Sequence, residues 1–127
     1  MILPFIFLAP TKCMGRGVFT DEPVSAGTVV EIAPVIVMSA EERKLLDQTR
    51  LYDYIFEWGD NKDHCIIALG YVPMYNHSYQ SNCEYEMDYE HDLIHIRAVR
   101  DIAKGEELFI NYNGEWNDES PLWFDAK

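Results

Sequence analysis

Cysteine and basic side chains are both scarce in this sequence, and each shortage excludes a class of protein. Three cysteines occur, Cys13, Cys65 and Cys83, and no two of them form a CxxC pair. A disulfide framework or a structural zinc site needs more cysteines, or closer pairs of them, than these three provide. We therefore expect a reducing, intracellular compartment. Lysine and arginine total 10 against 22 acidic residues, which gives a net charge of −12. Because non-specific nucleic-acid binding needs a basic face, we expect no direct nucleic-acid partner.

A long apolar run is also missing. The apolar start of the chain, residues 1–10, has no basic residue, contains Pro4 and Pro10, and is too short to span a bilayer. We therefore expect a soluble protein with no membrane segment, in which residues 2–8 form a buried first strand. The histidines and cysteines include no pair with ligand spacing, so we expect no metal site.

The composition indicates one globular domain. Of the 127 residues, 48% are hydrophobic and 13% are aromatic, which is enough to form a hydrophobic core without stabilising disulfide bonds or metal ions. We find no internal repeat or linker, and expect a single domain over residues 1–127 with an aromatic tail at 113–127. The acidic surplus would raise the encounter rate with a cationic partner, although solubility alone would also explain it.

Short strands dominate the predicted secondary structure. Segments rich in β-branched or alternating apolar residues, bounded by turn residues, predict strands. They lie at residues 18–20, 28–37, 64–69 and 108–112, with a hairpin formed by 83–89 and 93–99. Pro34 should either bend the segment 28–37 or divide it into two strands.

One helix is predicted after this segment. Ser39 and Glu42 form a capping box that starts the helix, which should end near residues 47–49. The spacing places Leu45 and Leu46 on its buried side. Residues 51–58 alternate aromatic and acidic side chains, and we expect them to be extended.

A polar segment interrupts the apolar pattern at residues 71–83. Its sequence, YVPMYNHSYQSNC, sets Asn76, His77, Ser78 and Asn82 among aromatic and apolar residues without a helical or strand period. Such side chains hold irregular turns by bonding nearby backbone. Buried polar groups need partners, so another part of the chain must brace this segment.

Three motifs in order resemble the SET-domain protein-lysine methyltransferases. They are Gly15-x-Gly17-Val18-Phe19, Asn76-His77-Ser78 followed by Asn82-Cys83, and Gly105-Glu106-Glu107-Leu108 leading to Tyr112. Each motif alone is weak evidence for the family, but the order and the separations of all three match it over roughly residues 5–115. The chain is similar to the compact, one-domain viral and bacterial members. It departs from the family pattern at Tyr79, where cysteine is common, and at Ser81, where proline is common.

The resemblance implies a mainly β fold, the SET fold or β-clip. This fold consists of short curved sheets with one short helix, and its C-terminal strand passes under a loop as a pseudoknot. Residues 71–83 and 106–112 would then cross, and the crossing would brace the polar segment.

The resemblance also implies S-adenosylmethionine as cofactor. The residues expected to contact it are Arg16, Gly17, Asn76, His77, Tyr112 and Trp116, with Trp123 as the alternative to Trp116. Glycine suits position 17 because no Cβ blocks a close backbone approach to the methionine end. The Asn76 side chain would bond the ammonium group and the His77 backbone would meet the adenine, although a histidine in a loop can also be purely structural.

Methyl transfer to lysine needs a neutral amine held in line with the methyl group in a dry channel. By resemblance, Tyr112 would place its hydroxyl beside the transferring methyl, orient the amine and assist its loss of a proton. Tyr54 and Tyr85 would form channel walls, with Ile110 facing the same channel. The Tyr85 hydroxyl would limit the product to one or two methyl groups. Core packing is the alternative for each tyrosine, and for Tyr85 this means packing on the outer hairpin.

The expected substrate is a basic, lysine-containing protein segment such as a histone tail, which the negative charge would attract. A catalytically silent SET module that binds a peptide or partner is the first alternative. A non-enzymatic β-clip interaction domain without cofactor affinity is the second. A homodimer also remains open, because compact members can pair to complete the substrate groove and Trp123-Phe124 could serve that end.

Overall fold

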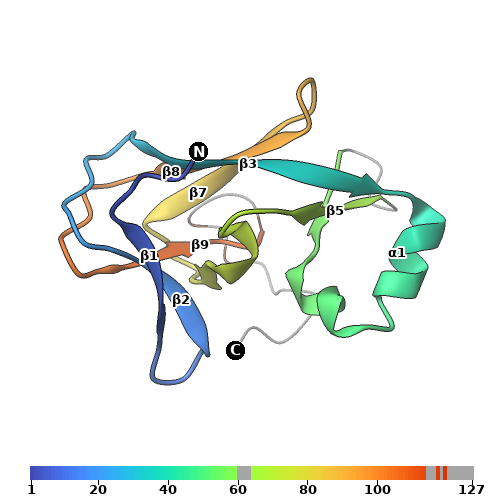
Figure 1. Ribbon diagram of the computed structural model, residues 1–127, viewed down its shortest axis with the longest axis horizontal. Coiled ribbons are helices and arrows are strands. Elements are labelled where there is room, and N and C mark those ends of the chain that lie inside the picture. The colour runs from blue at the N-terminus through green and yellow to red at the C-terminus, as the bar shows by residue number, and fades with distance from the viewer. Residues whose placement is uncertain (60–63, 114–116, 118, 120–127) are drawn as a thin grey trace.

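The computed structural model describes residues 1–59, 64–113, 117 and 119, which form a mainly β fold (Figure 1). The strands are β1 (Ile6–Pro10), β2 (Arg16–Thr20), β3 (Val29–Met38), β4 (Phe56–Glu57), β5 (Cys65–Ala68), β6 (Asn76–His77), β7 (Cys83–Asp88), β8 (Leu93–Ala98) and β9 (Glu107–Ile110). The helical elements are α1 (Ala40–Leu46) and two short 3-10 helices, η1 (Arg50–Tyr54) and η2 (Val72–Met74). The predicted fold class is confirmed. None of the described helices is long and apolar enough to cross a membrane.

One sheet joins three segments that are far apart in the sequence, in the order β1-β2-β9-β6. Strand β9 pairs antiparallel with β2, where Val18 faces Leu108. On its other edge β9 pairs parallel with β6, where Asn76 faces Phe109 and His77 faces Ile110. The polar segment and the C-terminal strand therefore lie side by side, as the pseudoknot topology requires.

The other sheet has the order β4-β5-β3-β8-β7, and its long strand β3 changes partner at Pro34. Before this proline β3 pairs with β8, and from Val35 onward it pairs with β5. Proline has no N–H to donate to a ladder, so one partner strand can end at this point and the next can begin. The segment is one strand and not two, and its irregularity lies between Val29 and Glu31, not at Pro34 where a bend or a break was predicted.

The N-terminal strand starts later than predicted. Residues 2–8 were expected to form it, but β1 covers Ile6–Pro10, and Ile2 makes only an isolated bridge with Glu31. Ile6 is buried while Phe7 is exposed, since β1 pairs with β2 on one edge and presents alternate side chains to water. The predicted hairpin of β7 and β8 is confirmed.

The helix starts as predicted but does not bury its leucines. Ser39 Oγ accepts a bond from Glu42 N at 3.2 Å, and Glu42 Oε1 accepts one from Ser39 N at 2.9 Å, which completes the capping box. Leu45 is 68% exposed and no residue of α1 is buried, so that prediction was wrong. The cause is the position of α1 at the far end of β3, where this two-turn helix covers neither sheet (Figure 1).

The segment after the helix is extended only in part. Residues 51–58 were predicted to be extended, but Arg50–Tyr54 form η1, capped by Thr49, whose Oγ1 accepts a bond from Leu51 N at 3.2 Å. A hydroxyl cap can stabilise a short helical turn locally even where side chains alternate. Extended pairing is limited to β4, which adds to the edge of β5.

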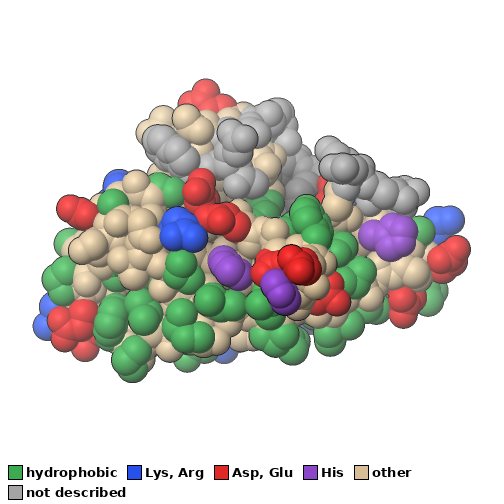
Figure 2. Space-filling model, turned by 90° about the horizontal axis from the view of Figure 1, so that it is seen from above, with side chains coloured by type: hydrophobic (Ala, Val, Ile, Leu, Met, Phe, Trp, Pro, Cys, Tyr) green, Lys and Arg blue, Asp and Glu red, His purple; other side chains and the backbone are tan. Residues whose placement is uncertain are grey.

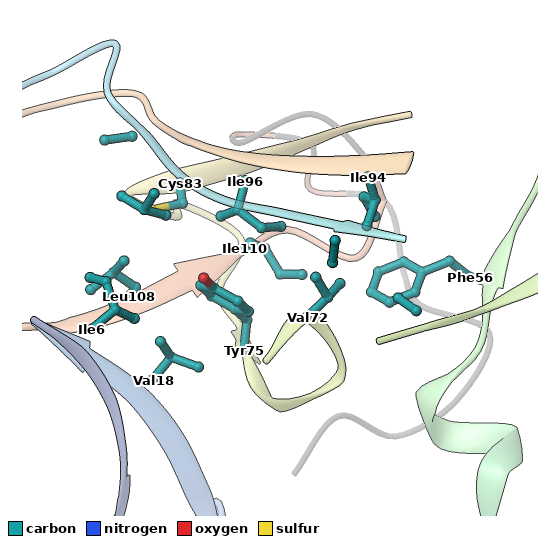
Figure 3. Close-up of a cluster of buried hydrophobic side chains, with 14 of the residues drawn as sticks. Ile6, Val18, Phe56, Val72, Tyr75, Cys83, Ile94, Ile96, Leu108 and Ile110 are labelled. Carbon is teal, nitrogen blue, oxygen red and sulfur yellow. The ribbon is translucent and has the colours of Figure 1, made fainter. Parts of the chain in front are cut away.

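The hydrophobic core takes side chains from both sheets (Figure 3). Val18 and Leu108 come from the first sheet, and Ile94 and Ile96 come from the second, all without measurable exposure. Tyr75 enters this core from the segment before β6 and is also completely buried. The core therefore supports the crossing of β6 and β9 from beneath, and this crossing carries the polar side chains considered next.

Candidate active site

The Asn82 side chain links the polar segment, residues 71–83, to strand β9 by hydrogen bonds. Its Oδ1 accepts a bond from Phe109 N at 2.8 Å, and its Nδ2 donates to Glu107 O at 2.8 Å. The side chain is buried and uses both ends of its amide on the backbone of β9, as a buried polar group must. The prediction that another part of the chain braces this segment is confirmed.

Asn76 joins the same crossing to the β2 strand. Its Nδ2 donates to Arg16 O at 3.2 Å and to Glu107 Oε2 at 2.8 Å. Both neighbours are acceptors, so the amide nitrogen must face them and the amide oxygen must face elsewhere. No described residue donates to that oxygen, and Asn76 Oδ1 therefore remains able to accept a bond from a ligand.

Gly17 of β2 lies in close contact with the side chains of Glu107 and Asn76. A Cβ at this position would collide with the Glu107 carboxylate and come within 2.9 Å of Asn76 Nδ2. Only glycine leaves room for the Glu107 carboxylate here, so the space that a Cβ would need is filled by protein side chains. Burial raises the pKa of Glu107, while its bond from Asn76 partly offsets that rise.

His77 is held in one neutral tautomer. Its Nδ1 accepts a bond from Tyr112 N at 3.0 Å, so the ring proton belongs on Nε2. Burial lowers the pKa of His77, which favours the neutral ring. Nε2 is buried and no described residue bonds to it. The Tyr79 ring packs edge-on against the imidazole at 4.4 Å between centroids, so the tyrosine that replaces the family's usual cysteine helps to enclose this ring.

Tyr112 lies at the C-terminal end of the crossing, and its hydroxyl donates to Tyr75 O at 2.6 Å. Burial, with a smaller effect from Tyr54, raises the pKa of Tyr112 well above its ordinary value. The phenol therefore stays protonated at neutral pH, and its proton is committed to the Tyr75 carbonyl. This geometry suits an orienting hydroxyl and does not suit a phenolate base, so we retain only the first of the two predicted roles.

Tyr85 and Phe56 complete an aromatic cluster with Tyr112. The Tyr85 hydroxyl donates to Tyr112 O at 3.1 Å, and burial raises the pKa of Tyr85 above its ordinary value. The Phe56 ring meets Tyr85 edge-on at 5.1 Å and Tyr112 at 6.4 Å between centroids. Tyr54 is 38% exposed, yet close enough to affect the pKa of Tyr112. The structure thus brings the three predicted tyrosines together.

Other predicted residues have different positions. Ile110, predicted to face the channel, is completely buried in the hydrophobic core. Arg16 meets Asn76 through its backbone carbonyl, and the contact of this backbone with the cofactor stays a prediction. Trp116, Trp123 and the segment Trp123-Phe124 lie outside the described residues.

Glu31 is a site residue that sequence reasoning missed. It is completely buried, and its carboxylate accepts bonds from Tyr71 N at 2.7 Å and from the Tyr75 hydroxyl at 2.9 Å. Burial raises its pKa, and the two hydrogen bonds partly offset this effect. Since the Tyr75 carbonyl accepts the Tyr112 hydroxyl, Glu31 anchors the residue that orients Tyr112. A charged residue inside the β-branched run 28–37 was the signal for it.

The residues of the crossing fit the methionine end of the predicted cofactor. Asn76 Oδ1 and Glu107 Oε1 have no donor among the described residues, and both side chains lie against Gly17. The buried Nε2 of His77 adds a donor that also has no described partner. An ammonium group would satisfy the two acceptors, because it has three donors and no acceptor.

Comparison with known sequences identifies the family. A model of the SET domain matches residues 15–113. A histone-lysine N-methyltransferase of Schizosaccharomyces pombe, specific for H3 lysine 37, is 36% identical over 116 residues, which are 91% of this chain and 74% of that protein. Histone-lysine N-methyltransferase SETD7 of Halocynthia roretzi is 24% identical over 145 residues, which span 96% of this chain but 37% of that protein.

Solved structures agree with the sequence comparison. The crystal structure of a candidate histone methyltransferase from Plasmodium falciparum matches with a TM-score of 0.67 at 26% identity, over 87% of this chain and 99% of that chain. A chain of ctPRC2, in an autoinhibited conformation bound to S-adenosylmethionine, matches with a TM-score of 0.71 over 84% of this chain and 15% of that chain. Its identity is 22%, so it supports the fold alone. With its three motifs joined at the β6–β9 crossing, this chain belongs to the SET-domain family.

Proposed function

We propose that this protein transfers a methyl group from S-adenosylmethionine to a lysine side chain in a basic protein segment such as a histone tail. The enzyme class and the cofactor are those of its histone-lysine methyltransferase relatives. The observation that carries the proposal is the cluster of Tyr112, Tyr85 and Phe56 at the end of β9, next to the Asn76–His77 crossing.

The aromatic cluster would make the lysine reactive by removing it from water. A free lysine has a pKa near ~10.4, so about one in a thousand is neutral at physiological pH. Desolvation disfavours the ammonium form and lowers this pKa. The rings of Phe56, Tyr85 and Tyr112 provide an apolar wall, and their faces also attract the cation on its way in.

The hydroxyls would hold the amine in line for transfer. Tyr112 gives its proton to the Tyr75 carbonyl, so its oxygen would meet the lysine nitrogen as an acceptor. Tyr85 gives its proton to the Tyr112 carbonyl and can accept in the same way. Correct alignment of two reactants can supply roughly 7–11 kcal/mol at the extreme, and fixed hydroxyls achieve it without reorganisation during the reaction.

The cofactor supplies a methyl group on a positively charged sulfur, and the protein supplies its position. Asn76 would hold the ammonium end, next to the backbone of Arg16 and Gly17. The chain's own part would be to hold the lysine amine, with Tyr112 and Tyr85, in line with that methyl group. Since Tyr112 stays protonated, the lysine must lose its proton to water before the transfer.

The charge of the chain supports a basic substrate. The net charge is −12, and the face in Figure 2 shows acidic side chains on several parts of the surface and few basic ones. A negative surface raises the rate of encounter with a lysine-rich segment.

A methyl-transfer assay with tritiated S-adenosylmethionine tests the proposal. We expect label on the lysines of histone H3 or of another member of a panel of basic proteins and peptides, and far slower labelling with the Tyr112→Phe variant. Cofactor binding without transfer to any basic substrate would instead favour the catalytically silent module. No cofactor binding by calorimetry would favour the β-clip interaction domain.

A further inference from the structure

Two exposed side chains with large apolar surfaces, Leu51 and Tyr54, share one side of η1. In a 3-10 helix three residues make one turn, so side chains three positions apart are eclipsed. None of the residues of η1 is buried. Leu51 is 43% exposed and Tyr54 is 38% exposed, so this side of η1 presents apolar surface to solvent.

One end of this apolar surface is continuous with the candidate lysine channel. Phe56, two residues after Tyr54, belongs to the hydrophobic core and packs edge-on against Tyr112 at 6.4 Å between ring centroids. Burial raises the pKa of Tyr112, and the nearby Tyr54 phenol adds to this effect. A peptide whose lysine enters the aromatic cluster therefore passes beside η1.

The other end of η1 is fixed by Thr49. Its Oγ1 donates to Leu46 O, at the end of α1, at 2.7 Å and accepts a bond from Leu51 N at 3.2 Å. A contact made by a fixed backbone loses less conformational entropy on binding than one made by a mobile loop. Leu51 therefore has a set position relative to Tyr54.

The spacing of the two side chains matches that of an extended peptide. Three residues of a 3-10 helix rise about 6 Å, and alternate residues on one face of an extended chain are about 6.6 Å apart. Resting on the proposed function, we propose that Leu51 selects substrates with a large apolar side chain two residues from the target lysine. The lysine enters the cluster beside Tyr54, and the apolar side chain packs on Leu51.

Short peptides with one central lysine, terminal arginines and serine elsewhere measure this selection. Leucine replaces serine two residues before the lysine in one peptide and two residues after it in another, because an extended chain can run along η1 in either direction. In a control peptide leucine is next to the lysine and points to the opposite face. We expect the unmodified protein to favour one of the first two peptides over the serine peptide about tenfold in kcat/KM for tritium transfer, about 1.4 kcal/mol. We expect no such preference for the control peptide.

Leu45 provides a matched control variant. It is 68% exposed but belongs to α1, at the far end of β3 (Figure 1). We expect Leu51→Ser to reduce the preference to about twofold or less and to leave transfer to the serine peptide unchanged. Leu51→Met and Leu45→Ser should both retain the preference. Because both leucines are exposed, melting curves of all three variants should coincide with that of the unmodified protein.

The opposite results would overturn the proposal. They are the absence of a preference in the unmodified protein, a preference that survives Leu51→Ser, or one that Leu45→Ser also removes. Equal slowing of every peptide by Leu51→Ser would assign Leu51 to the shape of the site and not to selection. Labelling of histone H3 without labelling of any peptide would show that contacts outside η1 select the substrate. If the unmodified protein binds S-adenosylmethionine but labels no protein or peptide, the proposed function itself fails, which is a different result.

Discussion

Replacing Tyr112 by phenylalanine gives the sharpest test of the proposed chemistry. The change removes one oxygen and keeps the ring that packs against Phe56. The hydroxyl bonds to the Tyr75 carbonyl at 2.6 Å, so its loss should cost about 0.5–1.5 kcal/mol of stability. For a domain of this size that is a fall of roughly 2–6 °C in melting temperature. Cofactor affinity should stay unchanged, because His77 bonds to the backbone N–H of residue 112 and not to its side chain.

The effect on turnover should be much larger than the effect on stability. Loss of a fixed group that orients the amine is expected to reduce kcat about 100-fold or more, which corresponds to about 2.7 kcal/mol of barrier. Because burial raises the pKa of Tyr112, the ratio of unmodified to variant activity should be constant between about pH 6 and 9. A ratio that grows with pH would instead indicate a phenolate base.

Single-turnover transfer of tritium to a basic peptide provides the measurement, with calorimetry for cofactor binding on the same samples. Tyr89→Phe is the matched control, since within the described part of the chain its hydroxyl bonds to the Met87 sulfur alone, on the exposed hairpin. A kcat within about twofold of the parent, a barrier change below roughly 0.5 kcal/mol, would reduce Tyr112 to a packing residue and refute the reasoning.

Three further predictions concern the same region. Asn76→Ala should weaken cofactor binding and lower stability by about 1–3 kcal/mol, because Glu107 and the Arg16 carbonyl lose a donor; unchanged affinity and melting temperature together would remove Asn76 from the site. The unmodified enzyme should stop at one or two methyl groups and Tyr85→Phe should add more, since the Tyr85 hydroxyl takes up space and would hold a water that a methylated amine must displace. Mass spectrometry showing abundant trimethyllysine from the parent, or an unchanged ratio in the variant, would contradict this. Native protein should react with iodoacetamide at exposed Cys13 but not at buried Cys83, because burial raises the pKa of Cys83 to about 12; rapid native labelling of Cys83, seen by peptide mapping, would disprove it.

Local chemistry explains what the sequence determined by itself. The capping box of Ser39 and Glu42, the β7–β8 hairpin and the strand at 64–69 depend on neighbours within a few residues, so their patterns were visible in the chain. The motif residues Asn76, His77 and Tyr112 were also found, because their types and order resemble the motifs of the SET family, whose model matches residues 15–113. Their membership of one site was predictable only through the resemblance.

Tertiary structure alone decided which of these residues touch. Glu31 meets Tyr75 across 44 positions, Asn76 meets Glu107 across 31, and Tyr112 meets Tyr75 across 37. No local pattern encodes such a pair, because it forms only when β9 passes beside β6 and the core closes beneath them. The exposed face of α1 was misjudged for the same reason. A two-turn helix shows which residues share a face, but only the placement of the sheets decides whether anything covers that face.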